Sequence, residues 1–494
     1  MNISEQIFDY ISKYTNLMFG NPGTTELPFL KYKPNSIKYY LALHDGIAVG
    51  MSAGSYLYNN KIGIVNLHAA PGLMNSIGYI YSAKLDRTPL LVIVGQQEST
   101  KLLDEPVLTV DLRKIPYVKE VIDVKNKKEA IKAISVGIRT ALSNPSGPVI
   151  VSLPFDIAEE ECEKTNITES IYTEEKLVLK PDILDQIAEE INNSKSIAIV
   201  AGYEIDLFDA HDELIEFSEK IGSPIFAEPY FSRSPSVKID AILPRKASQI
   251  NKILMRYDLV LLIGSTLHNV IFMDEDYMWE NIIQITTDHE ENVKRFWKSF
   301  LCDPKYFLKE ILLRVKEKKN NKKIPFTKNE VNKNVSQITE YLKKLLKDEA
   351  VFEETPAYRE TIMEILGNRK KLFFSNRSGF LGWALPASIG YAIAGGKSLT
   401  IIGDGSFHYS PQALWTASNY DIELKILVLN NKGYESLRSK ANYQADYLSP
   451  ITSPHKVAQA YGFEVVETTN WKSEIKWLME NDKKRKFLEI IIPE

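Results

Sequence analysis

Short runs of apolar, mostly β-branched residues alternate with helical patterns along the chain, and this alternation restricts the fold more than any other feature. The runs fall into three blocks, at 61–67, 89–95 and 147–154; at 196–202, 223–229, 258–264 and 281–288; and at 371–376, 398–405, 424–431 and 486–493. The polar segment 159–170 and the lysine-rich segment 314–334 separate the blocks. Such alternation is typical of parallel sheets that bind ligands at the carboxyl ends of their strands. We therefore predict an α/β chain of three doubly wound parallel-sheet domains, over residues 1–165, 175–315 and 335–494.

Bulk composition argues against several classes of protein. The 494 residues carry 60 basic and 64 acidic side chains, so the net charge of −4 offers no attraction for nucleic acid or a membrane surface. Cys162 and Cys302 lie far apart without a CxxC partner, which disfavours a disulfide framework and a zinc site. Glu5 and Asp9 stand where a signal peptide would be basic or apolar, and no apolar run reaches transmembrane length. We expect a cytoplasmic protein without nucleic-acid or membrane partners.

The strongest chemical signal is the segment 401–434. In its first half, Gly403 and Gly405 flank Asp404 where a strand gives way to a helix. Glycines at such a turn let backbone N–H groups approach phosphate oxygens, and the Ser406 hydroxyl can add a donor. Taken alone, the motif fits an ordinary strand-to-helix turn about as well as it fits a phosphate site.

The second half of the segment adds metal-binding chemistry. The next strand ends in Asn430 and Asn431. Because adjacent parallel strands end at the same edge of a sheet, we expect these amides near Asp404. A carboxylate, an amide oxygen, a backbone carbonyl, a water and two phosphate oxygens would complete the six-oxygen shell of magnesium. The sequence thus predicts a diphosphate held through a divalent metal ion, and the absence of a GxxxxGK[ST] motif excludes a Walker-type site.

The GDG motif followed by "NN" resembles the signature of the thiamine diphosphate (ThDP) enzymes. With the segments 18–30, 43–57 and 66–97, it makes the first and third blocks similar to benzoylformate decarboxylase, whereas the middle block resembles it only in architecture. Acetohydroxyacid synthases share the scaffold, but they are usually longer, bind flavin in the middle domain and differ around "NPG" and "GQQ". The resemblance implies the ThDP-binding fold, with pyrimidine, central and diphosphate domains, and the cofactors ThDP and Mg²⁺.

The resemblance also implies roles for individual residues of the third block. The positions that would bind Mg²⁺ are Asp404, Asn431 and the carbonyl of Gly433, and those that would contact the cofactor are Gly403, Gly405, Ser406 and Tyr434. Leu381 would be the bulky wedge beneath the bent cofactor, and Gly379 would offer its carbonyl to the aminopyrimidine. A plain core position is the alternative for Leu381.

Residues of the first and third blocks would also face the substrate. Thr24, after "NPG", matches a serine that contacts the substrate carboxylate in the family. His68 matches an active-site acid/base and follows a strand, where ligands bind. Ser436 and Leu437 would line the pocket. Lys440 occupies a position that is aromatic in benzoylformate decarboxylase, which weakens the case for an aromatic substrate.

Two further histidines have no assigned role. The second active-site histidine of the family falls at Ile271, three positions after His268. A shifted loop would let His268 substitute, and an ordinary position is the equal alternative. Whether His408 reaches a substrate is open.

Asp45 is the main departure from the family pattern. The segment around it aligns without gaps, and it places Asp45 where the family has the glutamate that hydrogen-bonds N1′ of the aminopyrimidine. Aspartate is shorter by one carbon–carbon bond, about 1.5 Å. Three explanations are open: the strand end moves inward, a water bridges the carboxylate to N1′, or activation of the cofactor is impaired. An N-cap for the following helix is the alternative reading. We favour a cofactor-facing, catalytic Asp45.

The resemblance implies non-oxidative decarboxylation of a 2-oxo acid, with carboligation to a 2-hydroxyketone as a further outcome. An acetolactate-synthase-like transferase is the first alternative, and a ThDP-binding relative with little catalysis is the second. In the family the cofactor lies between two subunits, so we expect a homodimer or homotetramer. The middle block lacks GxGxxG in 199–206, which disfavours a dinucleotide there.

Overall fold

The computed structural model describes residues 1–109, 111–164, 176–267, 273–276, 280–294, 296, 298–318, 332–450, 452–480 and 484–493. His268 and Ile271 lie outside these ranges. The chain forms two compact units. One consists of Met1–Thr173, Lys347–Ala357 and Ser378–Glu494, and the other of Glu174–Leu346 and Tyr358–Arg377.

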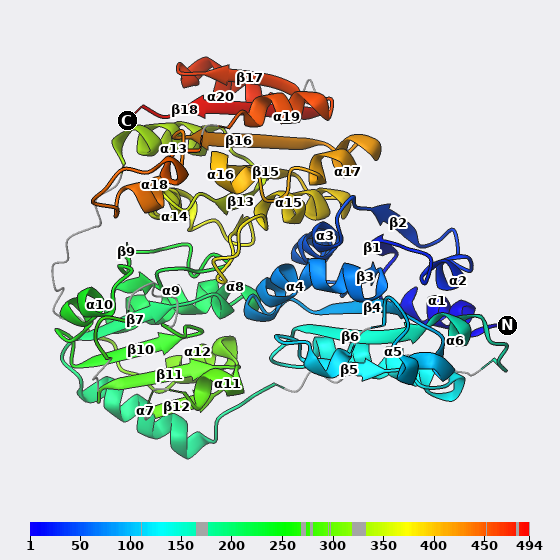
Figure 1. Cartoon of the computed structure of the whole chain (residues 1–494). Helices are drawn as coiled ribbons and strands as arrows, with labels where there is room; N and C mark the ends of the chain where they lie inside the picture. Colours follow the sequence, from blue (N-terminus) through cyan, green and yellow to red (C-terminus); the bar gives the residue numbers. More distant parts are fainter. Residues whose placement is uncertain are drawn as a thin grey trace. The chain divides into compact units, whose positions relative to one another are not determined.

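The first unit contains a parallel sheet of order β2-β1-β3-β4-β6-β5, drawn in blue and cyan in Figure 1. Its strands are β1 (Leu17–Asn21), β2 (Lys38–Leu41), β3 (Gly63–Leu67), β4 (Leu90–Gln96), β5 (Glu120–Asp123) and β6 (Pro148–Pro154). Its helices are α1 (Ile3–Ile11), α2 (Leu27–Leu30), α3 (Asp45–Asn59), α4 (Ala69–Leu85), α5 (Lys127–Leu142) and α6 (Phe155–Glu159).

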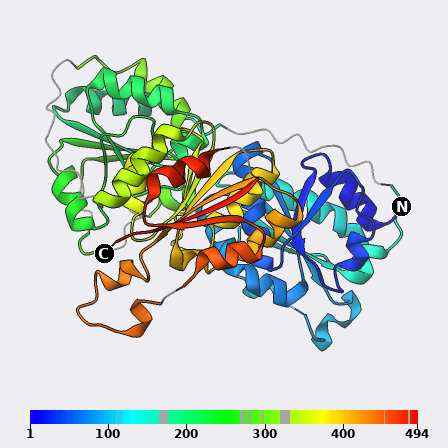
Figure 2. The ribbon, with the colours of Figure 1, turned by 90° about the horizontal axis from the view of Figure 1, so that it is seen from above.

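The same unit contains the parallel strands of the third block, in the order β13-β15-β16-β18-β17. These are β13 (Ala350–Glu354), β15 (Ser398–Gly403), β16 (Leu424–Asn430), β17 (Glu464–Thr468) and β18 (Arg485–Ile491). The helices are α15 (Ala384–Ile393), α16 (Asp404–Phe407), α17 (Ala413–Asn419), α18 (Glu435–Arg438), α19 (Pro454–Ala460) and α20 (Trp471–Met479). Figure 2 shows these strands, in yellow to red, running side by side between helices.

The other unit is built on a parallel sheet of order β12-β11-β10-β7-β8-β9. Its strands are β7 (Ile197–Ala201), β8 (Ile225–Ala227), β9 (Ala241–Ile242), β10 (Leu259–Ile263), β11 (Ile282–Thr286) and β12 (Lys298–Leu301). Its other elements are α7 (Pro181–Asn193), α8 (Glu204–Leu207), α9 (His211–Ile221), α10 (Ala247–Leu254), α11 (His289–Asn292), α12 (Pro304–Leu312), α13 (Lys333–Leu345), α14 (Arg359–Leu366) and β14 (Phe373–Phe374).

Both faces of the sheets are buried, which explains the continuous apolar runs in the sequence. In β4, Val92 and Val94 face one core while Leu91 and Ile93 face another. Alternate residues of a strand point to opposite faces, so an apolar run without polar alternation requires helices on both sides. The predicted α/β class with three doubly wound parallel sheets is confirmed.

Helices α3 and α15 pack through backbone contacts that admit no side chain. A Cβ on Gly54 of α3 would lie 1.8 Å from the carbonyl oxygen of Ala387, and one on Gly390 of α15 would lie 1.8 Å from that of Met51. The two helices therefore approach each other as closely as their glycines allow. This contact joins the helix that starts at Asp45 to the helix that follows the predicted wedge residue, Leu381.

Candidate active site

The residues predicted to bind diphosphate and metal come together at the carboxyl edge of the third-block strands. Gly403 of β15 pairs with Leu429 of β16, so Asp404 and Asn431 leave the two strands at the same edge. Both are buried, with 2% and 9% of their surface exposed. Asp404 Oδ2 and Asn431 Oδ1 have no hydrogen-bond partner among the described residues. Buried oxygens without partners are destabilising, and such a pair fits a bound metal ion.

Electrostatics at this edge also fit a cation. Burial raises the pKa of Asp404 to about 6, and the backbone N–H groups of Asp404 itself, Gly405, Asn431 and Gly433 partly offset the rise. These N–H groups place the turn 431–433 beside the carboxylate. Gly433 has φ 153°, and a Cβ there would lie 2.8 Å from Ser449 Cα, so the turn requires glycine.

The other predicted residues of the third block lie around this turn. The Tyr434 ring packs on Gly405, where a Cβ would lie 2.7 Å from Tyr434 Cε1. Ser406 is buried on α16, and Gly403 precedes it as the N-cap. Ser436 is half-buried on α18, and the neighbouring Leu437 is 51% exposed. The structure therefore brings Tyr434 to the GDG motif.

A buried carboxylate that the sequence analysis did not single out holds the predicted wedge loop. Both oxygens of Glu354, at the end of β13, accept hydrogen bonds from backbone N–H groups: Oε1 from Gly382 at 2.6 Å, and Oε2 from Trp383 and Ala384 at 2.8 Å. A carboxylate at the first turn of α15 satisfies donors that a helix leaves unpaired. Leu381, half-buried, precedes the clamped residues.

Asp45 is not the helix cap. The N-cap of α3 is His44, whose Nδ1 accepts a hydrogen bond from the Gly46 N–H at 3.1 Å, so the capping alternative is wrong. Asp45 is 4% exposed, and its Oδ2 accepts a hydrogen bond from Asn21 Nδ2 at 3.3 Å. Its Oδ1 has no partner within the described part of the chain. A buried oxygen left open in this way fits a donor from a bound cofactor.

His68 is held by a carboxylate that the sequence analysis missed. His68 Nδ1 lies 2.9 Å from Glu26 Oε2, and Glu26 is fully buried. Glu26 Oε1 accepts hydrogen bonds from Thr25 Oγ1 at 2.7 Å and from the Ala69 N–H at 3.1 Å. Thr24, the predicted substrate contact, is exposed, and its neighbour Thr25 lies against the imidazole instead, at 3.2 Å. With Nδ1 directed at Glu26, the tautomer of His68 is fixed and Nε2 stays available for proton transfer.

Tyr79 links the two groups of predicted site residues. Its ring packs on Gly46, where a Cβ would lie 2.4 Å from Tyr79 Cδ2, and its hydroxyl donates a hydrogen bond to the Gly382 carbonyl at 3.1 Å. The helix that begins at Asp45 and the loop that contains Leu381 are therefore fixed to each other through one buried phenol.

Comparisons with known proteins agree with this geometry. Three profiles of one family match the chain: the N-terminal TPP binding domain of thiamine pyrophosphate enzymes at residues 1–114, the central domain at 184–311 and the C-terminal TPP binding domain at 360–488. The chain belongs to the thiamine pyrophosphate enzymes. Thiamine pyrophosphate is the cofactor called ThDP above, so the family matches the predicted fold and cofactor. No helix among the described residues is long and apolar enough to cross a membrane.

Relatives of this ThDP enzyme include two kinds of catalyst. Benzoylformate decarboxylase from Pseudomonas aeruginosa is 28% identical over 85% of this chain and 84% of its own length. The acetolactate synthase large subunit from Lactococcus lactis is 23% identical over 92% of this chain and 86% of its own. Among solved structures, benzoylformate decarboxylase from Polynucleobacter necessarius has a TM-score of 0.90 at 27% identity, covering 100% of this chain and 99% of that one. A putative thiamin diphosphate-dependent enzyme from Mycobacterium smegmatis has a TM-score of 0.91 at 26% identity, with both chains fully covered.

Proposed function

We propose that the protein catalyses the ThDP- and Mg²⁺-dependent, non-oxidative decarboxylation of a 2-oxo acid, with carboligation to a 2-hydroxyketone as a further outcome. The observation that carries this proposal is a set of three buried oxygens without partners among the described residues: Asp45 Oδ1, Asp404 Oδ2 and Asn431 Oδ1. Each stands at a position where the family resemblance expects the cofactor or its metal. The similarity to benzoylformate decarboxylases supports the reaction class.

The cofactor would supply a nucleophilic carbon and then hold the electron pair that carbon dioxide leaves behind. Asp404, Asn431 and the Gly433 carbonyl would bind the metal that carries the diphosphate. The carboxylate of Asp45 would accept a hydrogen bond from N1′ of the aminopyrimidine. His68, with Nδ1 held by Glu26, would deliver and remove protons through Nε2. Leu381 would support the cofactor ring, and Thr24 would bind the substrate carboxylate.

A panel of straight-chain, branched and aromatic 2-oxo acids tests the proposal. With ThDP and Mg²⁺ present, carbon dioxide release from at least one acid is expected, followed by an aldehyde. Failure to bind ThDP at all, measured by calorimetry, would overturn the assignment of the three oxygens. Cofactor binding without carbon dioxide release from any acid would overturn the decarboxylase proposal alone.

An acetolactate-synthase-like transfer is the second candidate, supported by the acetolactate synthase relatives. Product analysis with pyruvate separates the two, because decarboxylation gives acetaldehyde and transfer gives acetolactate. The third alternative, a weakly catalytic ThDP protein, makes a prediction at Asp45. Asp45→Glu should raise turnover sharply in a disabled enzyme, and should lower or barely alter it in one whose backbone has adapted.

The compact unit that contains β7 to β12 disfavours a flavin-dependent form of the acetolactate-synthase-like transferase. Glu204 and Glu228 follow β7 and β8 and are fully buried at the carboxyl ends of the strands. Burial raises the pKa of Glu228, and the charge of Arg377 partly offsets the rise. Glu228 accepts hydrogen bonds from the Thr266 N–H at 3.3 Å and the Ser265 hydroxyl at 3.1 Å. These glutamates occupy the edge where dinucleotides bind, and their oxygens already accept hydrogen bonds from the protein, including that from the Thr287 N–H to Glu204 at 3.0 Å.

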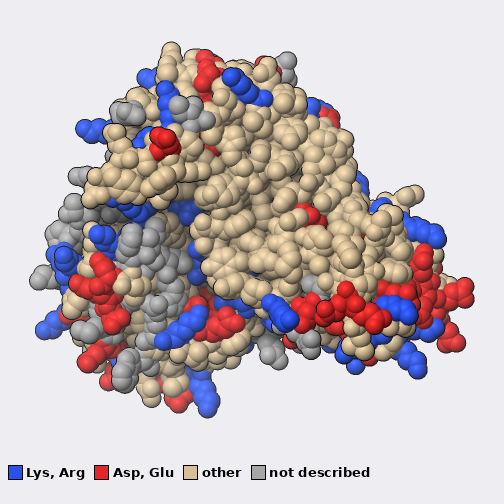
Figure 3. Space-filling model, in the orientation of Figure 1, with Lys and Arg blue, Asp and Glu red and all other residues tan. Residues whose placement is uncertain are grey.

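We further propose that the active form is a homodimer or homotetramer with sites at subunit interfaces. Figure 3 shows a broad face with few charged side chains over the unit that contains the cofactor residues. This unit also exposes large apolar side chains next to site residues in the chain, such as Leu27, Leu43 and Leu437. Two inactive variants, Asp45→Ala and Asp404→Ala, should restore activity when co-expressed if each site takes one residue from each copy. Analytical ultracentrifugation measures the assembly directly, and a monomer with full activity would contradict the proposal.

A further inference from the structure

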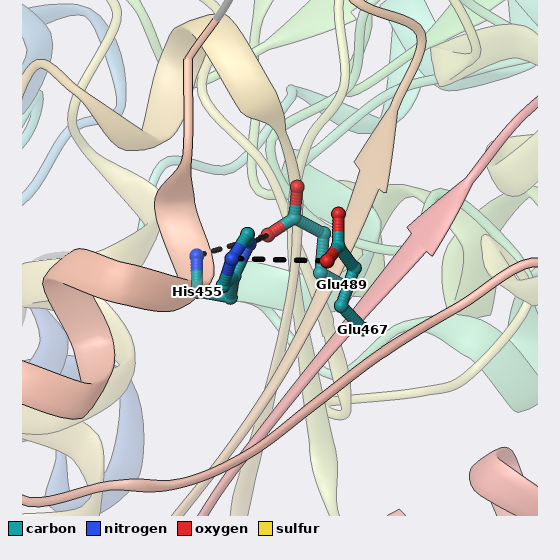
Figure 4. Close-up of side chains that lie close together, drawn as sticks. All are labelled: His455, Glu467 and Glu489. Carbon is teal, nitrogen blue, oxygen red and sulfur yellow. Dashed lines mark hydrogen bonds and ion pairs between the residues drawn. The ribbon is translucent and has the colours of Figure 1, made fainter.

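A polar cluster contacts Asn430, the residue that precedes the predicted metal ligand Asn431. It consists of His455 at the start of α19, Glu489 on β18 and Glu467 on β17 (Figure 4). Glu489 pairs in register with Glu467 on one side and with Val428 of β16 on the other. Two carboxylates thus stand on neighbouring strands, and the imidazole of His455 faces both of them.

The hydrogen bonds of this cluster do not leave room for a metal of its own. Glu489 is 1% exposed, and its Oε2 accepts hydrogen bonds from the His455 backbone N–H at 2.9 Å and from His455 Nδ1 at 2.7 Å. Its Oε1 accepts one from Asn430 Nδ2 at 2.5 Å. His455 Nε2 lies 3.7 Å from the half-exposed Glu467. Both oxygens of Glu489 and one nitrogen of His455 already take part in hydrogen bonds. The cluster therefore holds another group of the protein by hydrogen bonding and does not bind a cation.

That protein group is Asn430, the last residue of β16. The bond from its Nδ2 to Glu489 fixes the orientation of the amide, and its Oδ1 accepts a hydrogen bond from the Lys432 N–H at 2.8 Å. The backbone carbonyl of Asn430 accepts the Ile492 N–H at 2.8 Å. Both ends of this side chain and its carbonyl are therefore engaged, immediately before Asn431.

The turn that Asn430 holds is strained. Lys432 has φ 59°, a left-handed conformation that is unfavourable for a residue with a side chain, and Gly433 follows at φ 153°, which glycine adopts without strain. Conformations of this kind persist only where surrounding contacts enforce them. The hydrogen bond to the Lys432 N–H is such a contact, and it acts on the residue between the two predicted metal ligands, Asn431 and Gly433.

We infer that His455 and Glu489 are positioning residues for the metal site. Through Asn430 they hold the turn 430–433 in the conformation that presents Asn431 Oδ1 and the Gly433 carbonyl beside Asp404. The inference rests on the proposed function, since it concerns the same Mg²⁺. Partners of this kind behind a metal ligand typically change metal affinity by about 10- to 100-fold when they are replaced.

The test is Mn²⁺ binding to the full-length protein in the presence of ThDP, followed by the electron paramagnetic resonance signal of free Mn²⁺. His455→Ala and Glu489→Gln should weaken binding by about 10- to 100-fold. His455→Asn should restore most of the affinity, because its amide N–H can reach the place of Nδ1. Glu467→Gln is the matched control. Its contact with His455 is long and half-exposed, so it should bind Mn²⁺ within about threefold of the unaltered protein.

Two further readouts separate positioning from general damage. Thermal unfolding of metal-free His455→Ala and His455→Asn should be closely similar, and turnover at saturating Mg²⁺ should be largely retained. If Glu489→Gln does not fold, the comparison of the two His455 variants decides alone. Equal affinities for these two variants and the unaltered protein would overturn the inference and leave the proposed function standing. No Mn²⁺ binding by the unaltered protein would overturn both. A loss in Glu467→Gln equal to that in His455→Ala would overturn the inference in favour of metal binding by the cluster itself.

Discussion

Replacing Asp404 by asparagine should make the metal-free protein more stable while it abolishes metal binding. Asp404 is buried, its Oδ2 has no partner among the described residues, and burial raises its pKa to about 6. The charged form is therefore unfavourable in the folded chain until a cation arrives. Asparagine has nearly the same shape without the charge.

The pKa sets the size and the pH range of the effect. A rise from 3.8 to about 6 corresponds to at most about 3 kcal/mol, at about 1.4 kcal/mol per pKa unit. Because the folded-state pKa of this carboxyl is raised, the penalty is fully present above about pH 6 and is absent below about pH 4. Asp404→Asn should therefore gain up to about 3 kcal/mol at about pH 7.5 and almost nothing at about pH 4.

Calorimetric unfolding of both proteins in a chelator, across this pH range, measures the effect. Addition of ThDP and Mg²⁺ should reverse the order, since ligand that binds only the folded unaltered protein raises its stability. A variant that is less stable than the unaltered protein at neutral pH without metal would refute the reasoning. So would a gain in stability that does not depend on pH.

Three other predictions follow from contacts in the same unit. Asp45→Asn should bind ThDP and Mg²⁺ with affinities within about threefold of those of the unaltered protein, but its turnover should fall by about 10²- to 10⁴-fold, as for the loss of a general acid–base group. Exchange of the thiazolium C2 proton, followed by NMR, should slow in parallel. Unchanged exchange would contradict the role of Asp45. Glu26→Gln should lower kcat/KM by about 10- to 100-fold in steady-state assays, because a weaker acceptor no longer fixes His68, and full activity would show that the imidazole does not need this anchor. Gly54→Ala should destabilise the unit by about 1–3 kcal/mol, because its Cβ would clash with the backbone of Ala387. Gly147→Ala is the control: its Cβ would lie 3.6 Å from its nearest neighbour, so the unfolding midpoint should not change.

The sequence predicted the three sheets and the diphosphate edge because both depend on local patterns. Apolar runs identify buried strands, and parallel pairing then brings Asp404 and Asn431 to one edge without any knowledge of the packing. Inner strand β13 was not predicted, because it ends in Glu353 and Glu354, and charged residues normally indicate surface. Both glutamates are fully buried. Glu354 accepts hydrogen bonds from the start of α15 and Glu353 accepts them from Thr355, and these partners are in place only in the folded chain.

The hydrogen-bonded glutamate–histidine pairs that support the site could not be predicted for a similar reason. Glu26 and His68 are 42 residues apart, and His455 and Glu489 are 34 apart. No spacing rule joins such pairs, so only the folded chain reveals them. The N-cap of α3 shows a different limit. Aspartate is a favoured cap, but Asp45 already belongs to the helix and His44 takes the capping position. Side-chain preference alone could not distinguish these neighbours.

The glycine contact between α3 and α15 has a consequence for synthesis of the protein. Gly54 and Gly390 are more than 330 residues apart in the chain, so at about 5–20 residues per second the ribosome needs about 20–70 s to deliver the second helix after the first. During that interval the narrow face of α3 has no partner from its own chain. The first domain is therefore synthesised before the α15 residues that complete its core, such as Leu385 and Ile389, and this face of α3 stays uncovered until α15 has been made.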